Sequence, residues 1–379
     1  MKRNYKWLSI LGAFLIAFYM GSTIDVAPIN NRAIVVGMAI DSSDGELEIS
    51  AQILMTTASE TNESGSKMIS ARSRTVAAAL AQIAEYTSMQ LSLAHCNFLV
   101  LGEELLKTNA FSALDYLVRN AYLSENALLT GASGSAKEVL SSTVAFDQMS
   151  SFYAQRTLDT HADYDDVAVM TVKKFATERK KRNPSNYLTL IERLPLEKDS
   201  SKSATDENAS PSAGGEGETE YYYSMTRTAV FLGDSMLGIL EENETSGLNF
   251  ALDQVDHGSI EFKGNDGRLI DLYIVKSSTS ASYDRDASSV CYDISVSTIL
   301  KEVESSSGLN EEFVITITDE EKKIAEAQIR DNVLSCYRKC LDLGIDICDI
   351  SGAMYRMYRK EKTELNYDSV SVNVNIDVQ

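Results

Sequence analysis

Cysteine is scarce in this chain, and its spacing predicts neither a disulfide framework nor a metal site. Five cysteines are too few for a disulfide-stapled fold, and their odd number leaves at least one unpaired. Cys336 and Cys340 lie four residues apart, which makes them neighbours on one face of a predicted helix. Cys348 adds a third thiol with no histidine near it, whereas a zinc site needs four converging ligands. We therefore expect small, buried cysteines and no metal or other cofactor.

Histidine is scarcer still. The three histidines, His95, His161 and His257, are isolated from one another in the sequence. His95 borders a predicted buried strand, where we expect a hydrogen-bonded structural histidine rather than a general base. The sequence contains neither the Gly-x-Ser-x-Gly elbow of serine hydrolases nor the His-Glu-x-x-His motif of zinc proteases. No catalytic residue is therefore predicted.

Basic residues are outnumbered by acidic ones, 35 to 55, which gives a formal net charge of −20. A surface of this charge repels phosphate backbones, so we expect no nucleic-acid partner. The strongest basic cluster comprises Lys173, Lys174 and residues 179–182. We interpret it as the exposed end of a helix over residues 165–182, in preference to a lipid-headgroup site, because cations stabilise a helix C-terminus. The many acidic residues leave a carboxylate pair for glycoside hydrolysis open, although most should be solvated.

The N-terminus predicts export. Three basic residues precede an uncharged apolar run over residues 7–21, which is typical of a signal peptide or signal-anchor. The basic end stays in the cytoplasm, so the chain after about residue 25 should lie outside. A full span needs about 20 residues, which the run approaches if it is extended to Ile24. No small-x-small cleavage site follows, so we favour an uncleaved anchor within a signal or anchor segment at residues 1–29.

The first half predicts mixed strands and helices. Residues 33–40 form a continuous apolar run typical of a buried strand, and residues 47–55 alternate like a half-buried one. The turn at residues 41–45 joins these strands into a hairpin. Further predicted elements are a helix at 73–88, a strand at 97–101, helices at 103–107 and 110–120, a strand at 127–130 and a helix from Ser135. The order lacks a strict strand–helix–strand rhythm, which favours an α+β fold.

One glycine-containing turn resembles a phosphate loop. Gly131, Gly134 and Lys137 follow a predicted strand and open a predicted helix. The Gly-Lys-Ser/Thr ending of a true phosphate loop is missing, so the lysine stands at the wrong position. Ser135 and Glu138 have the spacing of a capping box, and a capped helix N-terminus is the favoured interpretation.

A polar segment divides the chain. Residues 198–219 carry hardly an apolar side chain larger than alanine, so they should not bury enough surface to offset the entropy of ordering. After it we expect strands at 225–232, 235–240, 268–277 and 289–301, a helix at 318–343 opened by a capping box, and a final strand at 370–378 with a polar outer face. The expected organisation is a signal or anchor segment at 1–29, an α+β domain at 30–195, a disordered acidic linker at 196–222, a small β-rich middle domain at 223–265 and an α+β domain at 266–379.

Several segments carry a family resemblance. They are residues 33–41 with Gly37 and a closing Asp41, residues 94–105, residues 134–140, residues 228–231 with Gly238 and Gly247, and the region of Gln328 and residues 342–344. In order and spacing they resemble the Ger(x)C family, the C subunits of spore nutrient-germinant receptors. The resemblance covers about residues 30–150 and 224–379. It departs from the family at the lipobox, where residues 21–25 read Gly-Ser-Thr-Ile-Asp in place of a cysteine followed by Trp-Asp.

The resemblance implies a multi-domain α+β protein of two to three domains, with mixed or antiparallel sheets and packed helices. It also implies a role in spore germination without enzymatic activity, beside two integral membrane receptor subunits of the A and B types. The membrane would be the spore inner membrane, with the protein on its extracytoplasmic side.

Two other functions remain open from the residues alone. An exported cell-wall (peptidoglycan) hydrolase would need a carboxylate pair facing a cleft. A solute-binding protein would need two similar α/β lobes around a ligand cleft, and the two halves of this chain do not read alike, the second being strand-rich.

Overall fold

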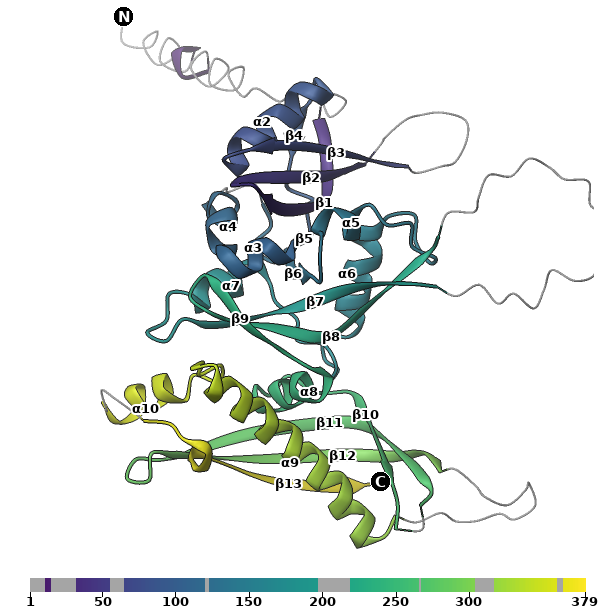
Figure 1. Ribbon diagram of the computed structural model, residues 1–379, viewed down its shortest axis with the longest axis vertical. Coiled ribbons are helices and arrows are strands. Elements are labelled where there is room, and N and C mark those ends of the chain that lie inside the picture. The colour runs from purple at the N-terminus through teal and green to yellow at the C-terminus, as the bar shows by residue number, and fades with distance from the viewer. Residues whose placement is uncertain are drawn as a thin grey trace, which may run out of the picture.

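The computed structural model shows two bodies stacked along the long axis of the molecule, each built on its own sheet (Figure 1). It describes residues 11–14, 32–54, 65–119, 123–196, 219–265, 267–303, 317–359 and 364–379. Mixed sheets with packed helices confirm the expected α+β class.

The larger sheet forms the N-terminal body. Its strands are β1 (Arg32–Ser43), β2 (Glu46–Leu54), β3 (Ser66–Ser73), β4 (Gln90–Ser92), β5 (Phe98–Leu101), β6 (Leu128–Ala132), β7 (Ser185–Pro195), β8 (Tyr221–Leu232) and β9 (Ser235–Leu240). They run in the order β3-β2-β1-β5-β6-β7-β8-β9, and β4 pairs with the start of β1. The central strands β1, β5, β6 and β7 are parallel, and the outer strands are antiparallel to their neighbours. The predicted hairpin of β1 and β2 is confirmed.

Helices cover both faces of this sheet. They are α2 (Val76–Thr87), α3 (Glu103–Thr108), α4 (Ala110–Arg119) and α7 (Val172–Glu178) on one face, and α5 (Ala136–Leu140) and α6 (Ser150–Thr160) on the other. The strand β5 shows why its sequence is apolar without alternation. Leu99 and Leu101 join the core under the first set of helices, whereas Phe98 and Val100 join the core under the second. A strand buried on both faces reads as a continuous apolar run.

The smaller sheet forms the C-terminal body. Its strands are β10 (Gly258–Lys263), β11 (Leu269–Asp284), β12 (Ser289–Val303) and β13 (Val370–Val378), and they pair in that order. β13 is parallel to β12, and the other pairs are antiparallel. The alternation predicted for the last strand is confirmed, because Val370, Val372 and Ile376 are buried while Ser371 and Asn373 are exposed. One face of this sheet is therefore open to solvent.

Two helices connect the cores of the two bodies. They are α8 (Glu242–Ala251), which precedes β10, and α9 (Asp319–Asp342). α9 is followed by α10 (Ile350–Tyr358) and the 3-10 turn η3 (Tyr367–Ser369). The predicted capping box of α9 is present. Its apolar stripe was expected to face one side, but Ile329 and Val333 pack on the smaller sheet while Cys336 and Cys340 reach the first core.

The short helix α8 lies between the bodies (Figure 1). Its Leu248 belongs to the first core and its Phe250 to the second. A Cβ atom on Gly247 would overlap the backbone of Asn332 in α9, so the two helix backbones are almost in contact at this glycine. Only glycine permits so close an approach.

The helix expected over residues 165–182 is wrong in its first half, because α7 begins only at Val172. The preceding residues give their carbonyl groups to other parts of the fold. Met170 accepts a hydrogen bond from the backbone N–H of Leu129 at 2.9 Å, and Val167 accepts one from Asn249 at 3.0 Å. Tertiary hydrogen bonds thus replace the local bonds that a helix would make.

The residues expected to form a middle domain, 223–265, are divided between the two sheets. β8 and β9 extend the larger sheet through the pairing of β8 with β7, and β10 is an edge strand of the smaller one. Strand pairing overrides the sequence boundary here because each strand completes the backbone hydrogen bonds of a neighbour. Most of the expected linker, residues 197–218, lies outside the described residues.

Of the expected N-terminal segment, only residues 11–14 are described, and they are helical. In the part of the chain that the structure describes, no helix has the length and apolar character needed to cross a membrane.

Candidate functional site

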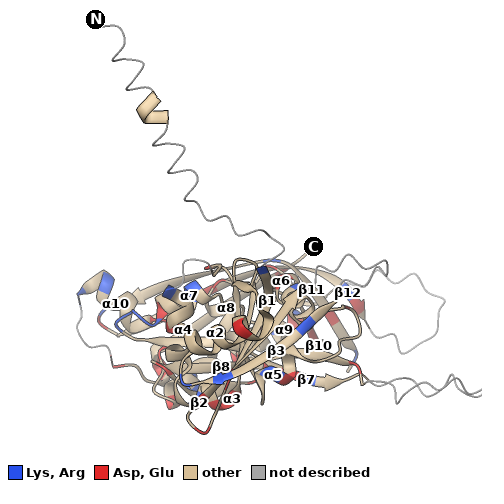
Figure 2. Cartoon of the chain, turned by 90° about the horizontal axis from the view of Figure 1, so that it is seen from above, with Lys and Arg blue, Asp and Glu red and all other residues tan. Residues whose placement is uncertain are grey.

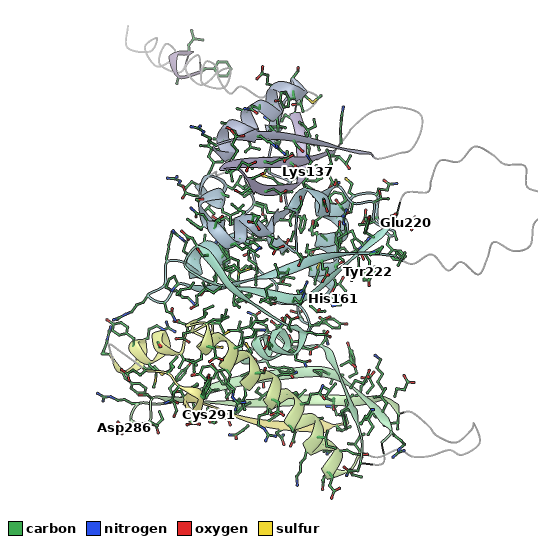
Figure 3. All side chains as sticks on the ribbon, in the orientation of Figure 1. Lys137, His161, Glu220, Tyr222, Asp286 and Cys291 are labelled. Carbon is green, nitrogen blue, oxygen red and sulfur yellow. The ribbon has the colours of Figure 1, made fainter. Side chains whose placement is uncertain are left out.

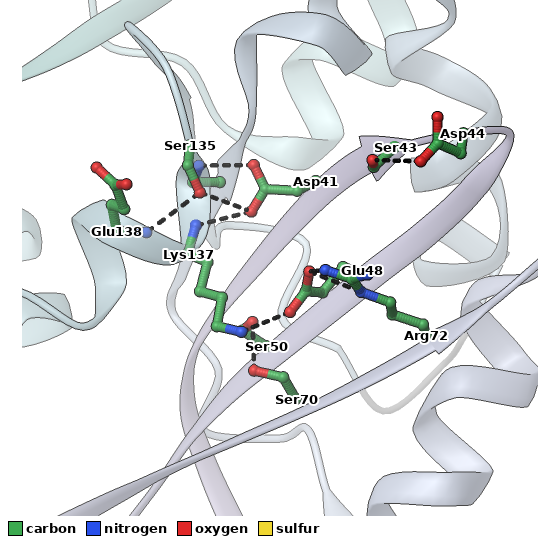
Figure 4. Close-up of polar contacts among 11 residues, drawn as sticks. Asp41, Ser43, Asp44, Glu48, Ser50, Ser70, Arg72, Ser135, Lys137 and Glu138 are labelled. Atoms are coloured by element: carbon green, nitrogen blue, oxygen red, sulfur yellow. Dashed lines mark hydrogen bonds and ion pairs between the residues drawn. The ribbon is translucent and has the colours of Figure 1, made fainter.

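A carboxylate joins the end of β1 to the start of α5 (Figure 4). Asp41 Oδ1 accepts a hydrogen bond from the backbone N–H of Ala136, and Oδ2 accepts one from that of Lys137, each at 2.8 Å. Ser135 Oγ donates to Oδ2 at 3.3 Å and also caps the helix. Burial raises the pKa of Asp41, although the two backbone N–H groups oppose this shift by favouring the ionised form. We call this arrangement the Asp41 cradle.

Glycine makes the cradle possible. A Cβ atom on Gly102 would overlap Oδ1 of Asp41. The backbone N–H of Gly102 donates to Ile40 at 2.9 Å, and that of Glu103 donates to Gly134 at 2.9 Å. The ends of β1 and β5 and the turn before α5 are therefore tied together at one point.

A second carboxylate holds the lysine of the glycine-containing turn. Lys137 Nζ lies 2.5 Å from Glu48, which also pairs with Arg72 at 2.7 Å (Figure 4). The hydrogen bond from Lys137 lowers the pKa of Glu48. In the turn that resembles a phosphate loop, the backbone N–H groups thus bind Asp41 and the lysine side chain binds Glu48, both of the same chain. The interpretation as a capped helix start is confirmed.

A third carboxylate lies between the two bodies. Asp165 Oδ2 accepts a hydrogen bond from Ser246 Oγ in α8 at 2.9 Å, and its carbonyl accepts one from Asn249 at 2.9 Å. A Cβ atom on Gly258 would overlap its Oδ1. Burial raises the pKa of Asp165 to about 6, and the charge of Asp166 adds to the shift.

Two of the three histidines pack against one tyrosine, Tyr164, next to this carboxylate in the sequence, which the spacing of the histidines does not indicate. The ring of Tyr164 lies between His161 and His257, with centroid distances of 5.1 and 5.7 Å. His257 stacks on Tyr273 of β11 at 6.2 Å, and Figure 3 places His161 at the boundary of the bodies. His95 is exposed elsewhere. The rings contribute packing across the boundary.

The basic cluster makes contacts inside the protein. Arg179 forms an ion pair with Asp234 in the turn between β8 and β9, and it lies over the ring of Phe111 at 4.0 Å. Arg182 lies over Tyr355 of α10 at 4.4 Å. The end of α7 thus connects to the β8–β9 hairpin, to α4 and to the C-terminal body.

Three cysteines gather where the cores of the two bodies meet. Cys336 and Cys340 are buried in the first core, and Cys348 packs against both cores. Burial raises the pKa of Cys348 to about 12, so its thiol stays protonated. All five cysteines are free thiols. Over the described ranges, no group of three histidine, cysteine or carboxylate side chains is arranged to hold a metal ion.

A polar groove of about 520 Å³ opens between β2, β3 and the segment from α5 to α6. Serine, threonine and glutamine side chains dominate its lining, and two of them, Gln52 and Ser150, are buried. Asp147 is its only carboxylate among the described residues, so the groove does not present a carboxylate pair.

Comparisons with known proteins match both halves of the chain. A family profile described as "Spore germination protein N-terminal domain" matches residues 25–193, and one described as "Spore germination B3/ GerAC like, C-terminal" matches residues 226–379. The chain belongs to the Ger(x)C family of spore germination proteins.

A solved structure shows a similar fold. "Crystal Structure of the GerBC protein" is 14% identical, covers 90% of this chain and 96% of its own, and superposes with a TM-score of 0.51. Comparison with curated proteins gives no match.

In this Ger(x)C protein, the N-terminal segments that carry the family resemblance meet at the Asp41 cradle. β1 supplies Asp41, the segment 94–105 supplies Gly102, and the segment 134–140 supplies the helix start. Gly37 lies four residues earlier on β1, where a Cβ atom would lie 2.6 Å from Cβ of Ser151 in α6. The N-terminal resemblance therefore marks a structural joint.

The cradle predicts a steric coupling between Gly102 and Asp41. Gly102→Ala should lower the free energy of unfolding by about 2 kcal/mol, because the added methyl group displaces the carboxylate. Gly65→Ala, where a Cβ atom meets open space, should change it by less than about 0.5 kcal/mol. In urea unfolding, Asp41→Ala combined with Gly102→Ala should cost less than the sum of the single variants. Additive costs would show that the clash acts elsewhere.

Asp165 predicts a pH-dependent stability. In the folded chain the carboxyl group of Asp165 has a pKa of about 6, against an ordinary value of 3.8. The protonated form thus favours folding, and the free energy of unfolding should fall as the pH rises from about 4 to about 6, by up to about 3 kcal/mol. Asp165→Asn should lack this component. Urea unfolding of both proteins between pH 4 and 7 isolates it, and a constant difference between their curves would contradict the assignment.

Proposed function

We propose that this chain is a non-catalytic C-type subunit of a spore nutrient-germinant receptor. It would lie on the outer face of the spore inner membrane, tethered by its N-terminal segment, and act by holding two integral membrane subunits of the A and B types. The observation that carries the proposal is the match of two spore germination profiles, in order, to residues 25–193 and 226–379. The basic residues before the apolar run at 7–21 support the outer location.

The chemistry of the described sites supports action by contact. The carboxylates of Asp41, Glu48 and Asp165 each bind groups of their own chain. The groove beside α5 and α6 has Asp147 in its lining and no facing partner among the described residues. A glycosidase of the usual kind needs two carboxyl groups across a cleft.

The architecture argues against a solute-binding protein. Such proteins enclose a ligand between two similar lobes. Here the first body is a mixed sheet covered by helices on both faces, whereas the second is a smaller sheet with one polar face. Residues of α8 and α9 pack into the cores of both bodies.

Deletion of the gene tests the proposal. Spores lacking the protein should form normally and still respond to non-nutrient triggers, while nutrient-triggered germination is abolished or slowed. A wild-type copy supplied in trans should restore the nutrient response. Unchanged nutrient germination in a strain without a second receptor of the same type would overturn the proposal.

Alanine substitution of single exposed carboxylates separates this function from an enzymatic one. Binding surfaces spread their energy over several residues, so each substitution should cause at most a graded loss of germination rate. Protein level and membrane association are measured in parallel. One carboxylate that is all-or-none in a folded, membrane-bound protein would favour the hydrolase.

A further inference from the structure

One stretch of the folded chain is almost without charge. From Thr75 to Gly102, Glu85 is the only acidic or basic residue apart from the histidine, in a protein of net charge −20. The stretch comprises α2, β4 and β5 with their connections. Figure 2 shows that acidic and basic residues are scattered over the rest of both bodies.

The outer side of α2 consists mostly of alanine, and Glu85 is the one charged residue of the helix. Val76, Leu80 and Ile83 face the sheet and are buried, as expected for an amphipathic helix. The opposite side exposes alanines at positions 77, 78 and 81, the last turn of the helix exposes Tyr86 (62%), and the turn after the helix exposes Met89 (40%). These exposed alanines with Tyr86 and Met89 form what we call the α2 surface. Its apolar side chains are not covered by any described part of the chain.

The α2 surface adjoins the point where the chain enters the fold. β4 follows the exposed turn directly and runs parallel to the start of β1, with Gln90 beside Arg32. Arg32 is the first described residue after the apolar run that ends near Ile24. Eight residue steps separate the two, which span at most about 28 Å when fully extended. Figure 1 places α2 at the end of the long axis that is farthest from the C-terminal sheet.

The charges around the α2 surface differ in sign from those of the whole protein. Arg32 and Arg74 are exposed at its borders, and Glu85 is the acidic residue within it, so the local balance is one positive charge. An anionic lipid surface repels a body of net charge −20 and attracts basic residues near it. The α2 surface combines this balance with exposed apolar side chains and a tyrosine, a residue type enriched at membrane–water interfaces.

We propose that the α2 surface is the face with which this protein lies against the lipid bilayer. The inference rests on the membrane tether of the proposed function and adds the orientation of the body. Tyr86 and Met89 reach the headgroup region, the alanine face lies along it, and the C-terminal sheet points away from the membrane.

Tryptophan fluorescence with lipid-borne quenchers tests this orientation in the full chain. Trp7 is the only tryptophan, so Trp7→Phe gives a background without one. Tyr86→Trp places a reporter on the α2 surface. Tyr367→Trp is the matched control, because Tyr367 is 52% exposed and lies in η3 of the C-terminal body. Each protein is reconstituted into vesicles of phosphatidylcholine and phosphatidylglycerol, with or without brominated acyl chains, and vesicle association is measured by flotation.

Brominated lipid should quench the Tyr86→Trp reporter to roughly half its intensity, because interfacial side chains reach the acyl boundary. The Tyr367→Trp reporter should keep its intensity. If the protein floats with the vesicles and neither reporter is quenched, or both are quenched equally, the orientation is overturned while the tether stands. The α2 surface would then be free for a protein partner. If the protein does not float, the tether fails and the orientation fails with it.

Discussion

The backbone pairing of β7 with β8 holds together two parts of the chain that residues 197–218 separate in the sequence. Pro195 pairs with Tyr221 at the end of the ladder next to residues 197–218, and the ladder continues to Ser185 opposite Leu232. This pairing places the β8–β9 hairpin on the larger sheet, and α8 begins directly after β9. Because α8 packs into both cores, the position of the C-terminal body depends on the same ladder.

The remaining joints have a common chemistry. The Asp41 cradle joins β1 to α5, and the Asp165 contacts join the segment before α7 to α8. In both, a carboxylate accepts internal hydrogen bonds and a glycine leaves room for it, Gly102 in the first joint and Gly258 in the second. Such groups position secondary structure.

The sequence predicts the elements with local signals and misses those that depend on distant partners. The continuous run in β1, the alternation in β13 and the Thr318–Glu321 capping box each identify their element correctly. The part of the predicted helix over residues 165–171 is wrong because backbone carbonyls there accept hydrogen bonds from distant groups. Strands β3 and β7 are missed because their register is defined by pairing with β2 and β8. The cradle itself has no local signature, since Asp41 meets α5 across nearly a hundred residues.

Cleavage between the two halves tests whether the pairing of β7 with β8 joins them into one scaffold. A specific protease site inserted within residues 198–219 allows the chain to be cut without changing either strand. The two fragments should elute together at the volume of the intact protein and separate only in denaturant, because the β7–β8 ladder holds them together. Independent elution of the fragments under native conditions, each still folded, would contradict it.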